Sequence, residues 1–141
     1  MINVTGTIDM QHMRYLNLFK KITYIDTRYC FKYNEMIVFC VPKQLLSRAL
    51  GENGNNLRRL SDIVGKRIRI VPIPLKVEHA KEFIQAIVAP LEFNDLTIGE
   101  NEIVLTAGSR NKASLIGRNK RRLIEMKQIV KDFFGKDFRI I

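Results

Sequence analysis

Residues 45–60 read LLSRALGENGNNLRRL, and the rest of the chain can be organised around them. Apolar residues recur at helical spacing on both sides of a four-residue segment, Gly51 to Gly54, that begins and ends with glycine. Glycine accepts a positive φ and allows close approach of another backbone, so the pattern predicts a helix, a tight bend and a second helix. The first backbone N–H groups of a helix have no partner within it, and the second helix could therefore bind a phosphate at its start.

The same pattern returns at Gly117, an offset of 66 residues from Gly51. Residues 111–123 again predict a short helix, a loop and a longer helix, and Leu57 matches Leu123 in this register. The sequence GKRIRIV at 65–71 matches GKDFRII at 135–141 after the second copy gains four residues, about one helical turn. A single glycine bend is a weak signal, but its repetition favours two copies of one structural unit.

Hydrophobic periodicity predicts the element order α-β-β-α-α-β in both copies, and hence an α+β fold. Besides the helices at the bends, helices are expected at 9–21, opened by Asp9, and at 76–89. Strands are expected at 25–33, 36–41, 66–71, 91–98, 102–106 and 136–141. Met13 and Ile63 are assigned to the buried sides of their helices. The stiff segment Pro72-Ile73-Pro74 predicts a boundary between a first domain, 1–73, and a second, 74–141.

The positive charge of the chain is localised. The formal net charge is +10 over 141 residues. Residues 43–76 carry eight Lys or Arg against two acids, and residues 110–127 carry seven against one, so the excess lies in the two segments that contain the bends. Such patches favour a polyanion, with nucleic acid before an anionic membrane. A solvated charged face is the alternative interpretation.

The sequence argues against an enzyme. His12 and His79 lie far from any cysteine, and no metal-binding, phosphate-loop or nucleophile-elbow motif occurs. Glu78 and Glu82 are one helical turn apart but suit a solvated helix face. We therefore expect no catalytic residue, no metal, no cofactor and no small-molecule substrate.

The apolar runs and the two cysteines bear on the cellular compartment and the redox state of the protein. The longest apolar run, Met36 to Val41, is too short to cross a bilayer, and no signal peptide opens the sequence, so we expect a cytoplasmic protein without a membrane partner. Cys30 and Cys40 fall in neighbouring predicted strands, where buried thiols are the default. A disulfide would require them to lie directly opposite each other.

The element order and the bends resemble the KH domain of the prokaryotic type, or type II, a three-stranded sheet with helices packed on one face. Gly51-Glu52-Asn53-Gly54 fits the GxxG loop of that domain fully, whereas in Gly117-Arg118-Asn119-Lys120 a lysine replaces the second glycine. Two such domains in tandem are similar to the archaeal form of the NusA family of transcription factors, over nearly all of the chain. The segment LIGRNKRR at 115–122 is similar to the second KH domain of that family.

The resemblance implies single-stranded RNA binding during transcription elongation or termination. We expect a monomer, with RNA polymerase as a further candidate partner. In KH domains the loop follows the phosphates of about four nucleotides, and bases rest in an apolar groove beside it. The resemblance implies RNA binding by the loop residues Gly51, Glu52, Asn53, Gly54, Gly117, Arg118, Asn119 and Lys120. Charge and position add Asn55, Arg58, Arg59, Arg121 and Arg122. The strand at 66–71 should border the groove, where Arg67 and Arg69 would reach phosphate if their face is open. Ala49, Leu50, Leu115 and Ile116 either line the groove or belong to the core. Lys120 is expected to give the second loop a different binding geometry.

Other functions remain open from the sequence. A helix-turn-helix protein that binds duplex DNA also joins two helices by a tight glycine turn, although strands on both sides of each helix pair argue against it. A ribosome-associated or ribosome-maturation KH protein shares the fold. A scaffold that holds RNA polymerase or a ribosomal subunit would leave the glycine loops incidental.

Overall fold

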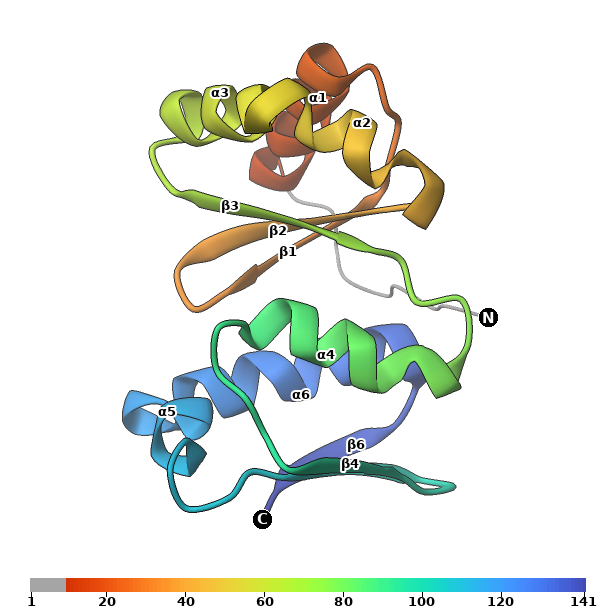
Figure 1. Ribbon diagram of the computed structural model, residues 1–141, viewed down its shortest axis with the longest axis vertical. Helices are drawn as coiled ribbons and strands as arrows, with labels where there is room; N and C mark the ends of the chain where they lie inside the picture. Colours follow the sequence, from red (N-terminus) through yellow and green to blue (C-terminus); the bar gives the residue numbers. More distant parts are fainter. Residues whose placement is uncertain (1–9) are drawn as a thin grey trace. The chain divides into compact units, whose positions relative to one another are not determined.

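The computed structural model describes residues 10–141, so Asp9, the expected start of the first helix, lies outside the described residues. The described chain divides into two compact units, residues 10–73 and residues 74–141. Each unit is α+β and contains one three-stranded sheet with its helices on one face (Figure 1). This arrangement is consistent with two KH-type domains.

The first unit is built around a central strand. Its elements are α1 (Met10–Thr23), β1 (Tyr29–Tyr33), β2 (Met36–Val41), α2 (Leu46–Leu50), α3 (Asn55–Val64) and β3 (Arg67–Pro72). β2 pairs antiparallel with β1 and parallel with β3. Asn34 and Glu35, the two residues between the strands expected at 25–33 and 36–41, form the turn that joins β1 to β2, with φ of 50° and 61°. Two consecutive residues with positive φ give the hairpin turn that follows the natural twist of paired strands.

The second unit repeats this topology. Its elements are α4 (Ala80–Val88), β4 (Asp95–Ile98), β5 (Glu102–Thr106), α5 (Lys112–Ile116), α6 (Arg121–Phe134) and β6 (Asp137–Ile140). β5 pairs antiparallel with β4 and parallel with β6. The 14 residues of α6 exceed the 10 of α3 by the four residues that the sequence repeat predicts. Both helices end at a glycine in the left-handed conformation, Gly65 and Gly135, which terminates a helix without strain.

Several elements start later than their hydrophobic patterns predict. β1 begins at Tyr29 rather than residue 25, because the Thr27 hydroxyl donates a hydrogen bond to the Cys40 carbonyl (2.6 Å) and accepts one from the Tyr29 N–H (3.3 Å). A side chain that bonds the backbone in this way replaces the regular strand ladder. β4 begins at residue 95 rather than 91, and α4 at residue 80 after a single turn of 3-10 helix rather than at 76.

The core of the first unit lies between the sheet and its three helices. It comprises Phe19, Ile22, Ile25, Ile37, Phe39, Val41, Ala49, Leu60, Ile68 and Ile70. The rings of Phe19 and Phe39 stack with their centroids 4.5 Å apart. Met13 and Ile63 do not join this core, contrary to the sequence prediction, and their side chains are 53% and 60% exposed. α3 packs through a narrower stripe centred on Leu60, which is fully buried.

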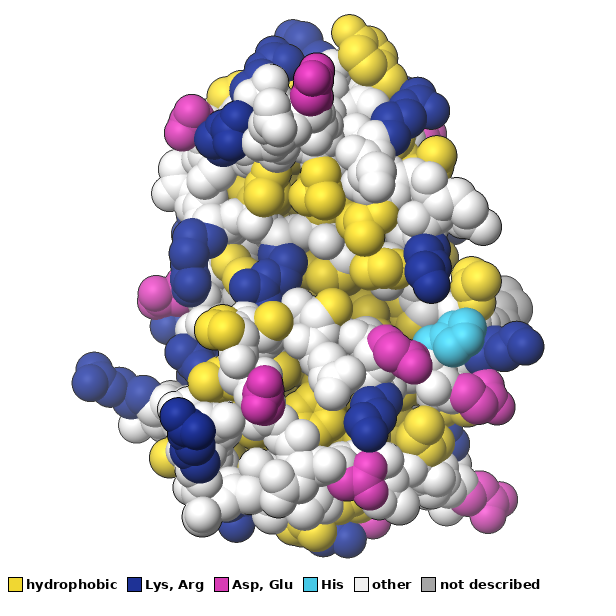
Figure 2. Space-filling view, viewed as in Figure 1, with side chains coloured by type: hydrophobic (Ala, Val, Ile, Leu, Met, Phe, Trp, Pro, Cys, Tyr) yellow, Lys and Arg dark blue, Asp and Glu magenta, His cyan; other side chains and the backbone are white. Residues whose placement is uncertain are grey.

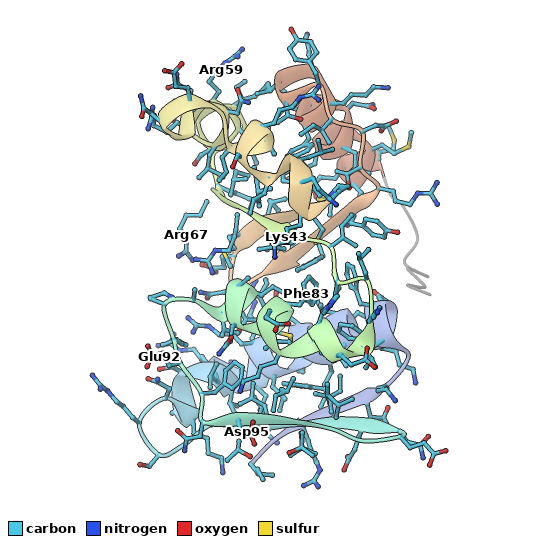
Figure 3. The ribbon with its side chains drawn as sticks, turned by 45° about the vertical axis from the view of Figure 1, so that its right-hand side comes forward. Lys43, Arg59, Arg67, Phe83, Glu92 and Asp95 are labelled. Atoms are coloured by element: carbon cyan, nitrogen blue, oxygen red, sulfur yellow. The ribbon has the colours of Figure 1, made fainter. Side chains whose placement is uncertain are left out.

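The core of the second unit is aromatic where helices meet. Phe83, labelled in Figure 3, lies on α4. Its ring centroid is 4.9 Å from that of Phe133 and 6.0 Å from that of Phe134, both on α6. The largest fully buried residues of this unit are Ile84, Ile87, Ile103, Leu105, Leu115 and Met126. Phe133 and Phe134 lie in the last turn of α6, the turn by which this helix is longer than α3.

The strand register decides the state of the two cysteines. Cys30 lies opposite Phe39, and Cys40 lies opposite Tyr29. Adjacent residues of a strand point to opposite faces, so the two thiols are on different faces of the sheet and form no disulfide with each other. Burial, and secondarily the neighbouring Cys30, raises the pKa of the Cys40 thiol well above its ordinary value.

Two substitutions on α3 test the observed stripe. Leu60→Ala removes a fully buried side chain and should lower the free energy of unfolding by about 2–5 kcal/mol. Ile63→Ala removes a side chain that is 60% exposed and should change it by no more than about 0.5 kcal/mol. Urea unfolding followed by circular dichroism measures both. Equal losses would mean that Ile63 is buried, as the sequence pattern suggested.

Candidate nucleic-acid interface

The first glycine bend is a compact turn at the protein surface. α2 ends at Gly51, whose φ of 79° and ψ of 170° are accessible almost only to glycine. One turn of 3-10 helix, Glu52–Gly54, follows, and the Gly54 N–H donates to the Gly51 carbonyl at 3.1 Å. Glu52 and Asn53 are exposed, and both glycines are half-buried. α3 then begins with Gly54 as its N-cap, so no side chain covers the start of the helix from that position.

The second bend has the same backbone. Gly117 has φ 79° and ψ 169°, and Asn119 has φ 55° and ψ 28° against 54° and 28° for Asn53. Lys120 takes the left-handed conformation that Gly54 takes in the first bend, with φ 60°, and its N–H donates to the Gly117 carbonyl at 3.1 Å. The replacement of glycine by lysine therefore leaves the main-chain path unchanged.

The space around each glycine explains why one was replaced and the other kept. A Cβ on Gly51 would lie 2.9 Å from Asn56 Cγ and 3.0 Å from the Asn56 backbone nitrogen, which is too close for carbon. A Cβ on Gly117 would likewise lie 2.9 Å from Arg122 Cγ. Near Gly54 the first atom met would be a terminal nitrogen of Arg58 at 3.8 Å, an ordinary contact. Only the first glycine of each bend is required by its surroundings.

The cations near the first bend are partly engaged by the protein itself. Arg58 folds back over the bend and donates to the Asn53 carbonyl (2.7 Å) and to the side-chain oxygen of Asn55 (2.6 Å). Arg59 is exposed and points outward from α3 (Figure 3). Glu52, inside the bend, is exposed and adds a negative charge.

The second bend carries a denser group of cations. Arg118, Lys120 and Arg121 are all exposed and lie within the bend or at the first residue of α6. Arg122 is less exposed than these three, and its guanidinium donates to the Ser114 carbonyl at 2.9 Å. In the space-filling view, Lys and Arg side chains lie over the α3 region of the first unit and project beside α5 in the second (Figure 2).

The structure does not bring Arg67 and Arg69 together with the first bend. Ile68 and Ile70 point into the core beneath the helices, so the two arginines of β3 point to the opposite face of the sheet. Arg67 is exposed and donates to the Asn34 carbonyl at 2.9 Å, in the hairpin turn (Figure 3). Arg69 is half-buried, and burial followed by the charge of Arg67 lowers its pKa.

The four apolar residues beside the bends divide into two classes. Ala49 and Leu115 are buried, at 0% and 2% exposure. Leu50 and Ile116, the residues directly before the glycines, are half-buried. Only the latter pair therefore offers apolar surface next to a bend.

Sequence reasoning missed Asn56, which donates from its side-chain nitrogen to the Arg48 carbonyl at 3.3 Å. The 66-residue offset pairs Asn56 with Arg122 and Arg48 with Ser114. The 66-residue offset could have identified this pair of positions. Because the residue types differ between the copies, a search for matching residues does not find it.

Other kinds of site were also sought in the described part of the chain. Residues 10–141 contain no group of three or more His, Cys, Asp or Glu side chains that could hold a metal ion. None of the helices in that range is both long and apolar enough to cross a membrane.

Comparison with known proteins finds a curated relative and a related structure. The chain is 30% identical over 92 residues to the probable transcription termination protein NusA of Methanococcus vannielii. The match covers 64% of this chain and 51% of that protein, so the chain spans about half the length of the relative it matches. The crystal structure of APE1850 matches with a TM-score of 0.66 and 19% identity, over 95% of this chain and 99% of that one, which shows a shared fold. No protein-family model matches the sequence.

The contrast between the two glycine positions can be tested in the second bend. Gly117→Ala forces a side chain into a backbone conformation reserved for glycine and against Arg122, and should lower the free energy of unfolding by about 1–3 kcal/mol. Lys120→Gly removes the strain of a lysine in the left-handed conformation, but it also gives the unfolded chain more conformational entropy. Because the first effect is larger, the free energy of unfolding should rise by up to about 1 kcal/mol. Urea denaturation of both variants gives the comparison. A stable Gly117→Ala protein would show that the bend can be built without this glycine.

Proposed function

We propose that the chain binds single-stranded RNA through its two glycine bends, as a NusA-like transcription elongation or termination factor. In this proposal residues 1–73 and 74–141 are two tandem type II KH domains, and the protein acts in the cytoplasm as a monomer without catalytic activity. The observation that supports it most is the recurrence of one exposed bend, with the same backbone angles, at the start of a helix in both units. The relative in Methanococcus supports the role in transcription, and RNA polymerase is a candidate partner.

The bends suit a sugar–phosphate backbone because they combine main-chain and side-chain donors. A helix start presents N–H groups and the positive end of the helix dipole, which together favour a phosphate. In the first bend Gly54, the N-cap of α3, has no side chain, which lets a nucleic-acid backbone approach the start of that helix closely. Leu50 and Ile116, half-buried beside the bends, provide apolar surface against which bases can rest.

The two bends make unequal electrostatic contributions in this proposal. At the first bend Glu52 offsets part of the positive charge, and Arg58 already bonds Asn53 and Asn55. At the second bend Arg118, Lys120 and Arg121 are exposed with no acid among them. Affinity at the second bend should therefore depend more steeply on salt. Each neutralised phosphate of a single strand contributes about 0.7 to the slope of the logarithm of affinity against the logarithm of salt concentration.

Competition binding distinguishes the proposal from the other functions that the sequence left open. Labelled single-stranded RNA would be displaced by unlabelled RNA, single-stranded DNA and duplex DNA over a series of salt concentrations. The proposal expects single-stranded RNA to compete best and affinity to fall with salt. Preference for the duplex would favour a DNA-binding helix-turn-helix, and weak binding that does not depend on the bends would favour a scaffold.

Lys120→Asp should weaken RNA binding at the second bend. The change replaces an exposed cation with an anion beside the phosphates, and we expect affinity to fall by about tenfold at low salt, with a salt slope smaller by about 0.7. Lys21→Asp, on the exposed surface of α1 in the first unit, makes the same change in net charge at a residue that belongs to neither bend and is the control. Equal effects of the two variants would attribute the loss to total charge rather than to the bend.

The double change Glu52→Asp with Asn53→Asp should weaken binding at the first bend, since it adds a negative charge where a phosphate would lie. The chain offers a matched control, because the exposed turn before β5 has the same Gly-Glu-Asn sequence at residues 99–101. Fluorescence anisotropy with a long single-stranded RNA should show a severalfold loss for the first pair and none for Glu100→Asp with Asn101→Asp. Full affinity after the change at 52 and 53 would exclude the first bend as a binding site.

A further inference from the structure

In both units a side chain from the start of the second helix reaches back beneath the bend. Asn56 donates from Nδ2 to the Arg48 carbonyl at 3.3 Å, and Arg122 donates from Nη1 to the Ser114 carbonyl at 2.9 Å. The donors are related by the 66-residue offset, and so are the acceptors. Each acceptor lies near the end of the helix before the bend, where carbonyls have no partner within the helix. The bond therefore ties the helix before the bend to the helix after it.

The same side chains fill the space that the first glycine leaves. A Cβ on Gly51 would meet Asn56 Cγ at 2.9 Å, and a Cβ on Gly117 would meet Arg122 Cγ at the same distance. The side chain that reaches back therefore packs against the first glycine, in the space that a Cβ would occupy. An asparagine and an arginine achieve the same contact on the same backbone, so the positive charge of Arg122 is not needed for it.

We propose that Asn56 and Arg122 are positioning residues that fix the angle of the two helices at each bend. Arg122, although basic and next to the bend, acts through the Ser114 carbonyl rather than by binding a phosphate. Its charge strengthens that hydrogen bond, because a charged donor forms a shorter and stronger bond to a carbonyl than a neutral one does. The phosphate contacts of the second bend are then left to the exposed cations Arg118, Lys120 and Arg121. This inference rests on the proposed RNA-binding function and makes its roles more specific.

The test exchanges the side chain of one unit for that of the other in the full chain. Arg122→Ala removes the hydrogen bond, Arg122→Asn introduces the side chain used in the first unit, and Arg121→Ala removes the neighbouring exposed cation. Affinity for single-stranded RNA is measured over a salt series. Arg122→Ala should bind about fivefold more weakly, the equivalent of one net hydrogen bond, with the salt slope of the parent. Arg122→Asn should return to within about twofold of the parent, whereas Arg121→Ala should reduce the slope by about 0.7.

The opposite pattern would overturn the proposal. If Arg122→Ala reduces the salt slope as much as Arg121→Ala does, and Arg122→Asn recovers no affinity, Arg122 binds phosphate directly. Recovery by asparagine cannot come from charge, because both Arg122 variants lose the same positive charge.

A measurement without RNA separates this inference from the proposed function. In nitrogen-15 NMR spectra of the free protein, Arg122→Ala should shift the amide signals of Gly117 and Asn119, and Arg122→Asn should return them toward the parent positions. Unchanged amide signals in Arg122→Ala would refute the positioning role even if RNA binding were strong. Shifted signals in a protein that binds no RNA would support the positioning role and refute the proposed function instead.

Discussion

The structure depends on the contact between a glycine that has no Cβ and the side chain that occupies the vacated space. At Gly51 and Gly117 the chain takes a φ of 79° and turns from one helix into the next, while Asn56 or Arg122 lies where a Cβ would be. Any other residue at these glycines would have to displace part of the following helix. The direction of that helix, and with it the position of its N–H groups, therefore follows from this one contact.

The second glycine of the motif is under a weaker constraint. A Cβ on Gly54 would make only an ordinary contact with Arg58, and Lys120 takes the equivalent conformation at a cost of about 1–2 kcal/mol. The bend can therefore exchange a glycine for a charged residue at that position without altering its main chain. The first bend has the uncharged Gly54 at this position, and Arg58 bonds to the Asn53 carbonyl beside it. The second bend has the cation Lys120 there, next to Arg118 and Arg121. The two copies share a geometry and differ in their charge.

Most of the fold could be predicted from the sequence, because the apolar spacing and the glycine positions indicate the same order of elements in both copies. The order of elements, the turn at Asn34-Glu35, the fully buried β2 and the extra turn of α6 all follow from apolar spacing and glycine positions. Helix starts and strand starts were less predictable, since competing local bonds decide them. The hydroxyl of Thr27 shortens β1, and apolar spacing contains no information about that bond.

The candidate site was predictable in its backbone but less so in its side chains. Glycine positions located both bends. Charge and position grouped Arg122 with the exposed cations, and the expected place of its strand put Arg67 beside the groove. Whether an arginine faces solvent, a carbonyl or the other side of a sheet depends on packing that becomes visible only in three dimensions. Ile63 was assigned to the core for the same reason, because its spacing is compatible with a stripe that α3 does not use.

The unlike cores of the two units have a consequence for how the chain folds. Two copies of one topology in a single polypeptide can misassemble, with a helix of one copy docking on the sheet of the other. In the first unit an aromatic pair joins α1 to the sheet, through Phe19 and Phe39, whereas in the second the aromatic contact joins α4 to α6, through Phe83 and Phe133. A hybrid core would leave a void in one place and crowd atoms in another, and close-packed interiors tolerate neither. The different packing of the two cores therefore favours the docking of each helix on the sheet of its own unit, although the two surface bends have the same backbone.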